Sequence, residues 1–230
     1  SPTQVGTDTT WNTVSKSYIG CIATKTDGTL WGWGNNDQGH LGINNRTQYS
    51  SPVQIAGNWS HARTSNYRSS GVKTDGTLWT WGANTNGELG LNNRGPSYVY
   101  SSPVQVGSGT DWSKVFMGSE KMGAIKTDGT LWTWGNNYGG SLGLNAPDND
   151  KRSSPVQVPG TTWSDASMSY SNVLATKTDN TMWGWGKNNV GNLGQNNRTD
   201  YSSPVQIPGT AWNNVQVIGG GSAGMAVKIV

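Results

Sequence analysis

The chain repeats a pattern of about fifty residues, and this repetition constrains its fold more than any other feature of the sequence. A Ser-Pro-x-Gln-Val or Ser-Pro-x-Gln-Ile tract recurs with its proline at Pro2, Pro52, Pro103, Pro155 and Pro204. A second tract, Thr-Asp-Gly-Thr-Leu-Trp-x-Trp-Gly, ends at Gly34, Gly82, Gly135 and, in a slightly changed copy, Gly186. Because one short unit cannot bury a core alone, the copies are expected to stack against one another.

Each unit is expected to contain four short strands. In the third copy these are Val115–Gly118, Met122–Lys126, Thr130–Trp134 and Ser153–Val158. Asp128-Gly129 predicts a hairpin turn, because this pair tolerates the positive φ that tight turns require. Pro155 lacks a backbone N–H and therefore predicts that the fourth strand lies at an outer edge.

Tryptophan is expected to supply much of the core. The sequence has 13 Trp and 33 Gly but a single Phe, and every Trp falls at a fixed offset within the repeat. Units that pack against one another in the same way need the same residue at the same position, so we favour a role for these tryptophans in the core. The alternative for such a ring of aromatic side chains is a surface on which sugars stack.

No segment has a 3.6-residue apolar period long enough for a helix, so an all-β fold is expected. Repeated units of four strands, with Gly and Trp at fixed offsets, predict a β-propeller of four-stranded antiparallel blades. Residues 1–230 form a single domain, with repeat units 1–50, 51–101, 102–153 and 154–202 and a partial unit 203–230. This gives four complete blades and a partial fifth. Pairing of Ser1–Val5 with the strands of Trp212–Val230 would close a five-bladed ring; the alternative is an open arc of a longer chain.

The pattern Gly-Thr-Leu-Trp-Thr-Trp-Gly-x-Asn-x-x-Gly-x-Leu-Gly, followed by Pro-Val-Gln, resembles the regulator of chromosome condensation repeat along the whole chain. The resemblance implies a propeller, usually of seven blades. Its members include a nucleotide exchange factor, secreted enzyme inhibitors and many microbial and phage proteins. The family tends to have a His three residues before the second-strand Ala, whereas the corresponding positions here hold Gly20, Arg68, Lys121, Asn172 and Ala223. These residues give no support to an exchange-factor role.

The sequence predicts no catalytic, cofactor-binding or metal-binding residues, and hence a protein that is not an enzyme. His40 and His61 occupy non-equivalent positions and have no neighbour at metal-ligand spacing. Cys21 is the single cysteine. The aspartates that recur once per unit are expected to form turns: Asp27, Asp75, Asp128 and Asp179.

Charge and hydropathy narrow the choice of partners. The net charge is +3, from 16 basic and 13 acidic residues that are interspersed along the chain, which does not favour nucleic-acid binding. No apolar run approaches the 18 or more residues of a membrane span, so no membrane insertion is expected.

One face of the propeller is expected to vary between copies. Strand direction alternates within a blade, so the first-to-second and third-to-fourth connections share a face opposite the Asp-Gly turns. The third-to-fourth loops differ in length at Asn45–Tyr49, Asn93–Tyr100, Ala146–Arg152 and Asn197–Tyr201. Variable loops on a rigid scaffold are typical of binding surfaces.

Tyrosine and arginine concentrate on this predicted face, and both are enriched in protein interfaces. The candidate binding residues are Arg46, Tyr49, Tyr67, Arg68, Arg94, Tyr98, Tyr100, Tyr138, Arg152, Tyr170, Arg198 and Tyr201. We therefore predict a recognition or adhesion module that binds a protein or a glycan. The alternatives are a structural component of a virion or cell surface, which could self-associate through open strand edges, and a secreted enzyme inhibitor. These interpretations favour an extracellular or virion-surface location.

Overall fold

The computed structural model describes residues 4, 6–209, 212–216 and 225–228. The first sheet contains β1 (Trp11–Lys16), β2 (Gly20–Lys25), β3 (Leu30–Gly34) and β4 (Tyr49–Ile55). The second contains β5 (Trp59–Ser65), β6 (Arg68–Lys73), β7 (Leu78–Ala83) and β8 (Val99–Gln105). The third contains β9 (Trp112–Met117), β10 (Lys121–Lys126), β11 (Leu131–Gly135) and β12 (Arg152–Gln157). The fourth contains β13 (Trp163–Met168), β14 (Asn172–Lys177), β15 (Met182–Gly186) and β16 (Tyr201–Ile207), and a hairpin of β17 (Trp212–Gln216) and β18 (Met225–Lys228) follows.

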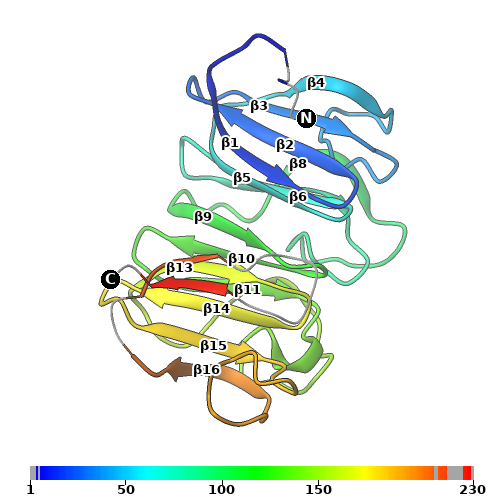
Figure 1. Ribbon diagram of the computed structural model, residues 1–230. Coiled ribbons are helices and arrows are strands. Elements are labelled where there is room, and N and C mark those ends of the chain that lie inside the picture. The colour runs from blue at the N-terminus through cyan, green and yellow to red at the C-terminus, as the bar shows by residue number, and fades with distance from the viewer. Residues whose placement is uncertain (1–3, 5, 210–211, 217–224, 229–230) are drawn as a thin grey trace.

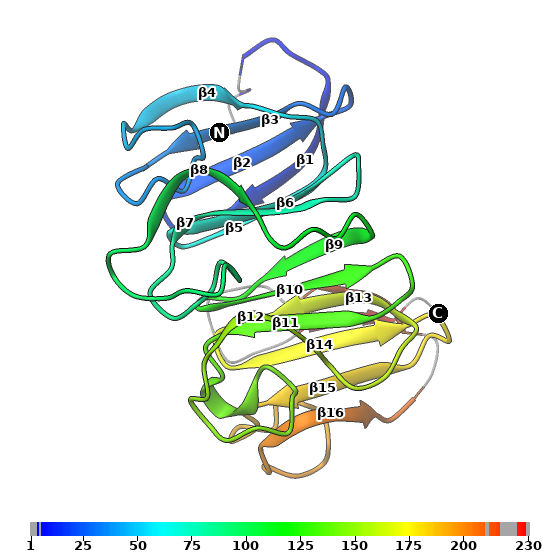
Figure 2. The ribbon, with the colours of Figure 1, turned by 180° about the vertical axis from the view of Figure 1, so that it is seen from behind.

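Each complete sheet is one propeller blade, with its strands paired antiparallel in chain order. The blades succeed one another from β1–β4 to β13–β16, as Figure 1 and the reverse view in Figure 2 show. The first strands β1, β5, β9 and β13 contact one another in sequence, and β17 contacts the fourth blade in the same way. The predicted all-β fold with four complete blades and a partial fifth is therefore confirmed.

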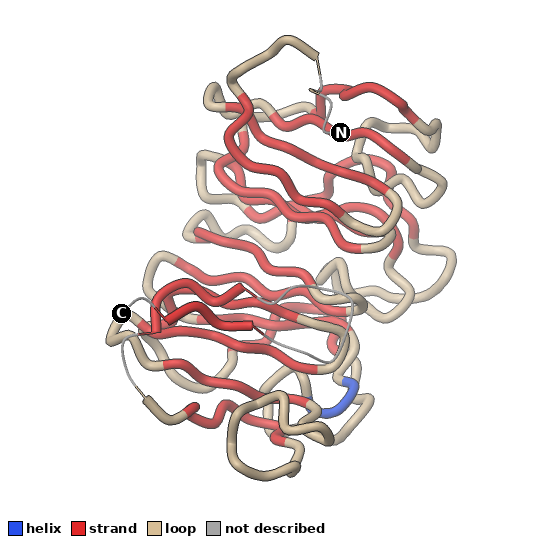
Figure 3. Tube along the Cα trace, in the orientation of Figure 1, coloured by secondary structure: helices blue, strands red, loops and turns tan. Residues whose placement is uncertain are grey.

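The strand bounds differ slightly from those expected. Trp112 was expected to precede the first strand of its blade, but it begins β9 and pairs with Lys126 beyond a local shift in register. The third strand begins at Leu131 because Thr130 belongs to the turn. A 3₁₀ turn at Tyr138–Gly140 is the single helical element of the described residues (Figure 3).

The core lies between neighbouring blades. One cluster combines Leu78 and Leu89 of the second blade with Val115, Met122 and Trp134 of the third, and all five are almost completely buried. Equivalent clusters fill the other two junctions between complete blades. The predicted core role of tryptophan is thus confirmed for the buried members Trp59, Trp81, Trp112, Trp134, Trp163 and Trp185.

In the second, third and fourth blades, a tryptophan of the third strand is hydrogen-bonded to the preceding blade. Trp134 Nε1 donates to the carbonyl oxygen of Glu88 at 2.6 Å. Trp81 and Trp185 make the equivalent bonds at 2.8 and 3.1 Å. Gly90 lies beneath the Trp134 ring with a φ of +69°, and a Cβ there would approach Nε1 to 2.9 Å. The glycine of Leu-Gly therefore recurs because the indole of the next blade occupies the space of a side chain.

The repeated aspartates form turns, as predicted. Asp128 Oδ1 accepts hydrogen bonds from the backbone N–H and the hydroxyl of Thr130, and that hydroxyl accepts from Trp132 Nε1. The same three bonds recur at the turns that begin with Asp27, Asp75 and Asp179. The lysine before each turn lies over the indole rings, which explains its recurrence.

The hairpin β17–β18 supplies the first two strands of the partial fifth blade. Most of Ser1–Val5, the expected fourth strand of that blade, lies outside the described residues, as do 217–224 between the two hairpin strands. The pairing of the two termini that would close a five-bladed ring therefore stays a prediction.

Candidate functional site

The blade connections divide between two faces. The first-to-second turns bond to the third-to-fourth loops, for example through Asn35 N–H to the Ile19 carbonyl and Asn136 N–H to the Glu120 carbonyl. We call this the loop face; it comprises turns 17–19, 66–67, 118–120 and 169–171 and loops 35–48, 84–98, 136–151 and 187–200. On the opposite face the Asp turns bond to the links between blades, as in Trp163 N–H to the Gly129 carbonyl; we call it the turn face.

Six of the seven candidate tyrosines fall into two groups. Tyr67, Tyr98 and Tyr170 are exposed, at 43%, 44% and 51%, and Tyr18 on the same face is 92% exposed. Tyr18, Tyr67 and Tyr170 lie in short turns and Tyr98 at the end of a longer loop, and exposed aromatic side chains of this kind are suited to contact with a partner.

The second group lies at the first or second residue of the outermost strands and is half-buried. The hydroxyl groups of Tyr49, Tyr100 and Tyr201 accept hydrogen bonds from Asn45, Asn93 and Asn197 at 3.1, 2.9 and 2.9 Å. The same bond closes the longer loop of the second blade and the two shorter loops of the first and fourth blades, so these tyrosines have a structural role in addition to any contact they make.

The candidate arginines also differ in their surroundings. Arg46 and Arg198 are exposed and make no hydrogen bond or ion pair within the described part of the chain. Arg152 is paired with Asp150 at 2.5 Å. Arg68, in contrast, is 7% exposed and its guanidinium is engaged inside the protein, so we leave it out of the contact surface.

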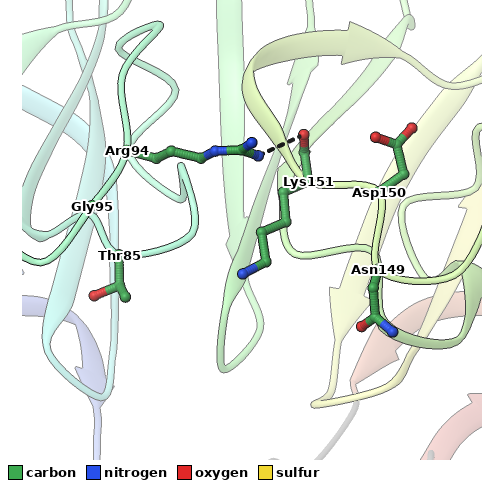
Figure 4. Close-up of a pocket in the computed structure, with 6 residues that line it drawn as sticks. All are labelled: Thr85, Arg94, Gly95, Asn149, Asp150 and Lys151. Atoms are coloured by element: carbon green, nitrogen blue, oxygen red, sulfur yellow. Dashed lines mark hydrogen bonds between the residues drawn. The ribbon is translucent and has the colours of Figure 1, made fainter.

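A polar cleft of about 580 Å³ lies between the loops of the second and third blades. Thr85, Arg94 and Gly95 line it from one loop, and Asn149, Asp150 and Lys151 line it from the other (Figure 4). Arg94 reaches across from its loop and donates from Nη1 to the Lys151 carbonyl at 3.3 Å. The cleft thus brings two cationic side chains from different blades close together.

A buried polar network supports this cleft. Lys151 Nζ donates to Asn86 Oδ1 at 2.6 Å, and the backbone N–H of Asn86 donates to the Glu88 carboxylate at 2.7 Å. Glu88 is fully buried and forms an ion pair of 2.6 Å with Arg68, which also donates to the Ser119 carbonyl of the next blade. Because each polar group has a partner, the network fixes the relative positions of the two blades.

Lys121 occupies in the third blade the position that Arg68 occupies in the second, and it also bridges two blades. Lys121 is 2% exposed and donates from Nζ to the Tyr170 carbonyl of the fourth blade at 2.7 Å. Burial lowers the pKa of Lys121 to about 7, while the Glu120 charge acts in the opposite direction. In the second and third blades, the residue at which the sequence departs from the family pattern therefore joins neighbouring blades.

The lowered pKa of Lys121 predicts that stability rises with pH. An unfolded lysine releases its proton near 10.4, so between about pH 7 and that value the unfolded chain binds the extra proton. We expect the free energy of unfolding to rise between pH 7 and 9, by at most about 1.4 kcal/mol per pH unit from this residue. Urea unfolding of Lys121→Met should lack this rise, whereas Arg46→Met, at an exposed site, should keep it. Parallel pH profiles for wild type and Lys121→Met would contradict the assignment.

An aromatic and charged cluster lies where the third and fourth blades meet. The rings of Tyr138 and Tyr170 are 5.4 Å apart, and Lys187 Nζ lies 5.3 Å from the Tyr138 ring centroid. Lys187 is also paired with Asp200 at 2.9 Å, a hydrogen bond that raises the pKa of the lysine. Candidate residues from two loops are therefore brought together here.

Sequence reasoning missed a group of titratable residues on the first strands. His61, Arg63, Lys114 and Asp165 come from β5, β9 and β13, and each is half-buried. His61 Nδ1 accepts from the Val115 N–H at 3.2 Å, and Lys114 Nζ donates to the Ser164 carbonyl at 2.8 Å. Burial raises the pKa of Asp165 against the opposing effect of Lys114 and Arg63. A sequence pattern could have revealed this group. Three of its four members lie two residues after the Trp that begins each first strand, and the residue type at that position varies between copies.

The described residues contain no group of three or more His, Cys, Asp or Glu side chains that could hold a metal ion. His40 and His61 lie apart on different blades, and burial lowers the pKa of both, to about 4 and about 3. Among the described helices, none has the length and apolar character needed to cross a membrane.

The radial four-stranded blades define the chain as a β-propeller. The sequence profile of the Regulator of chromosome condensation (RCC1) repeat matches residues 27–65, 75–125, 128–175 and 179–227. The chain therefore belongs to the RCC1 repeat family, as its sequence motifs predicted.

Solved structures share this fold at low sequence identity. Human WBSCR16 is 20% identical with a TM-score of 0.76, over 89% of this chain and 55% of that protein. Yeast RCC1 (Prp20), in a complex with Kap60, is 17% identical with a TM-score of 0.79, over 98% and 56%. Prp20p from Saccharomyces cerevisiae, in a second structure, is 16% identical with a TM-score of 0.80, over 98% and 58%. The chain thus spans a little over half the length of these proteins.

Proposed function

We propose that the protein is a non-enzymatic recognition module that binds a protein partner through its loop face. The observation that carries this proposal is the contrast between the faces. The loop face presents exposed tyrosines and unpaired arginines on loops of unequal length, whereas the turn face repeats one Asp-Thr-Trp turn in every blade. Tyrosine and arginine are the side chains from which protein interfaces gain most of their binding energy.

The solved relatives support a protein partner over a glycan. The yeast RCC1 structure contains Kap60, and the other Prp20p structure is described together with its binding to Gsp1p and histones. These partners belong to those proteins, at 17% and 16% identity, and we transfer to this chain only the class of partner.

The experiment compares two fourfold variants on a protein array and a glycan array. The loop-face variant carries Arg46→Ala, Tyr98→Ala, Tyr170→Ala and Arg198→Ala. The turn-face control carries Thr26→Ala, Thr74→Ala, Thr127→Ala and Thr178→Ala, which are exposed residues at the equivalent position of each Asp turn. Both variants are first checked for wild-type thermal unfolding.

We expect the wild type and the turn-face control to bind the same array proteins, and the loop-face variant to lose that binding. Binding that all three proteins retain would exclude the loop face as the recognition surface. Binding confined to the glycan array would replace the protein partner with a carbohydrate.

A further inference from the structure

The two faces of the molecule carry opposite charge. The loop face, with its adjoining strand ends, has the basic residues Lys16, Arg46, Arg68, Arg94, Lys121, Lys151, Arg152, Lys187 and Arg198 and the acidic residues Asp37, Glu88, Glu120, Asp148, Asp150 and Asp200. The turn face has the basic residues Lys25, Lys73, Lys126 and Lys177 and the acidic residues Asp8, Asp27, Asp75, Asp111, Asp128 and Asp179. The loop face therefore has three more basic than acidic residues, and the turn face two more acidic than basic.

Three of the six acidic residues on the loop face are engaged in short internal ion pairs. Glu88 is paired with Arg68, Asp150 with Arg152, and Asp200 with Lys187. The exposed cations Arg46, Arg94 and Arg198 have no ion-pair partner among the described residues. The charge that this face offers to a partner is thus positive, although the net charge of the chain is small.

The cleft between the second and third blades concentrates two of these cations. Arg94 uses only Nη1, in its long bond to the Lys151 carbonyl, so Nε and Nη2 have no hydrogen-bond partner within the described residues. Lys151 uses one N–H for Asn86, and an ammonium group has three donors. Both side chains are exposed and line the same cleft, so their remaining donors are accessible to a ligand (Figure 4).

The buried network beneath the cleft holds Lys151 in place. Asn86, which accepts from the ammonium group, is itself bound to the buried Glu88 by both its backbone and its side-chain N–H groups. Glu88 is in turn fixed by Arg68. A cation that is already ordered loses less conformational entropy when it binds a ligand, which favours affinity.

We infer that this cleft binds a carboxylate side chain from an acidic segment of the partner protein, an inference that rests on the proposed function. Arg94 donates to the carboxylate from Nε and Nη2, and Lys151 donates from the opposite wall. Charge-assisted hydrogen bonds of this kind are about twice as strong as those between neutral groups. Asp150, also in the cleft wall, is paired with Arg152, and this pairing offsets its negative charge.

An acidic peptide fits this face better than a nucleic acid does. The loop face interrupts its cations with Asp37, Asp148 and Glu120, so a continuous phosphate backbone would meet carboxylates along its path. Nucleic-acid binders cluster basic residues along one stripe, and this face does not. A short segment with a few carboxylates can place them at the cations alone.

The test uses a fluorescein-labelled peptide of alternating Glu and Gly residues, with the Gln-Gly peptide and a ten-residue single-stranded oligothymidine as comparisons. The cleft variant carries Arg94→Gln and Lys151→Gln. Its matched control carries Arg46→Gln and Arg198→Gln, which removes the same charge from the same face at a distance from the cleft. Binding is measured by fluorescence anisotropy at low and at physiological salt.

We expect the Glu peptide to bind the wild type, the Gln peptide not to bind, and the cleft variant to weaken binding at least tenfold against about twofold for the control. Equal weakening by both variants would replace the cleft with diffuse electrostatic attraction. Tighter binding of the oligonucleotide would replace the acidic segment with a nucleic acid, and no binding of any probe would overturn the inference. If the array binding survives in the cleft variant but is lost in the loop-face variant, the inference fails while the proposed function stands.

Discussion

Replacement of Arg68 by methionine is expected to lower the free energy of unfolding by about 3–5 kcal/mol, because it leaves a buried charge without its partner. Glu88 is fully buried, and Arg68 is its ion-pair partner at 2.6 Å. Arg68 also donates to the carbonyl groups of Ala83 and Ser119, and both bonds are lost. Chemical denaturation in urea at neutral pH measures the loss.

A second substitution separates the charge from the packing. In Arg68→Met with Glu88→Gln, the amide still accepts from the Asn86 N–H but carries no charge, so most of the stability should return. Arg46→Met, at an exposed position, should change stability by no more than about 0.5 kcal/mol. If Arg68→Met behaves like Arg46→Met, the Arg68–Glu88 pair does not join the blades as described.

Replacement of Trp134 by alanine is expected to cost about 3–5 kcal/mol, the range for removing a large aromatic side chain from a core. Trp134 is completely buried among residues of the second and third blades. Trp134→Phe keeps most of the packing but leaves the buried Glu88 carbonyl without its donor, at a cost of about 1–3 kcal/mol. Comparing the two variants by thermal and urea unfolding separates the contribution of packing from that of the hydrogen bond.

Trp33 supplies the matched control. It occupies the same position in the first blade, but it is half-buried and makes no Nε1 hydrogen bond to a preceding blade among the described residues. Trp33→Ala should therefore destabilise the protein less than Trp134→Ala. Equal losses at the two positions would show that contacts within a blade, and not between blades, determine the contribution of this tryptophan.

The repeat made the fold predictable. Fixed offsets of Trp, Gly and Asp predicted four strands per blade, the outer position of Pro155 and the packing of tryptophan between blades. These features follow from local geometry that every copy shares, so one unit contains enough information to deduce them. The start of β9 at Trp112 was missed because a shift in register, which has no sequence signature here, extends the pairing.

The site was predictable only in part. Exposed Tyr98 and Arg198 lie on the face that strand alternation indicated. The burial of Arg68 was not foreseen, since its partner Glu88 occupies a loop position that holds His40, Ser141 and Asn192 in the other copies. Contacts between non-repeated residues of different loops depend on tertiary structure, and a repeat pattern contains no information about them.

The central claim, that the loop face is the recognition surface, is tested most directly by amide hydrogen exchange with a protein partner identified on the array. We predict that binding slows exchange in loops 35–48, 84–98, 136–151 and 187–200 and leaves the Asp turns of the opposite face unchanged. Slowed exchange confined to residues 26–29, 74–77, 127–130 and 178–181 would contradict the account, because the partner would then occupy the turn face.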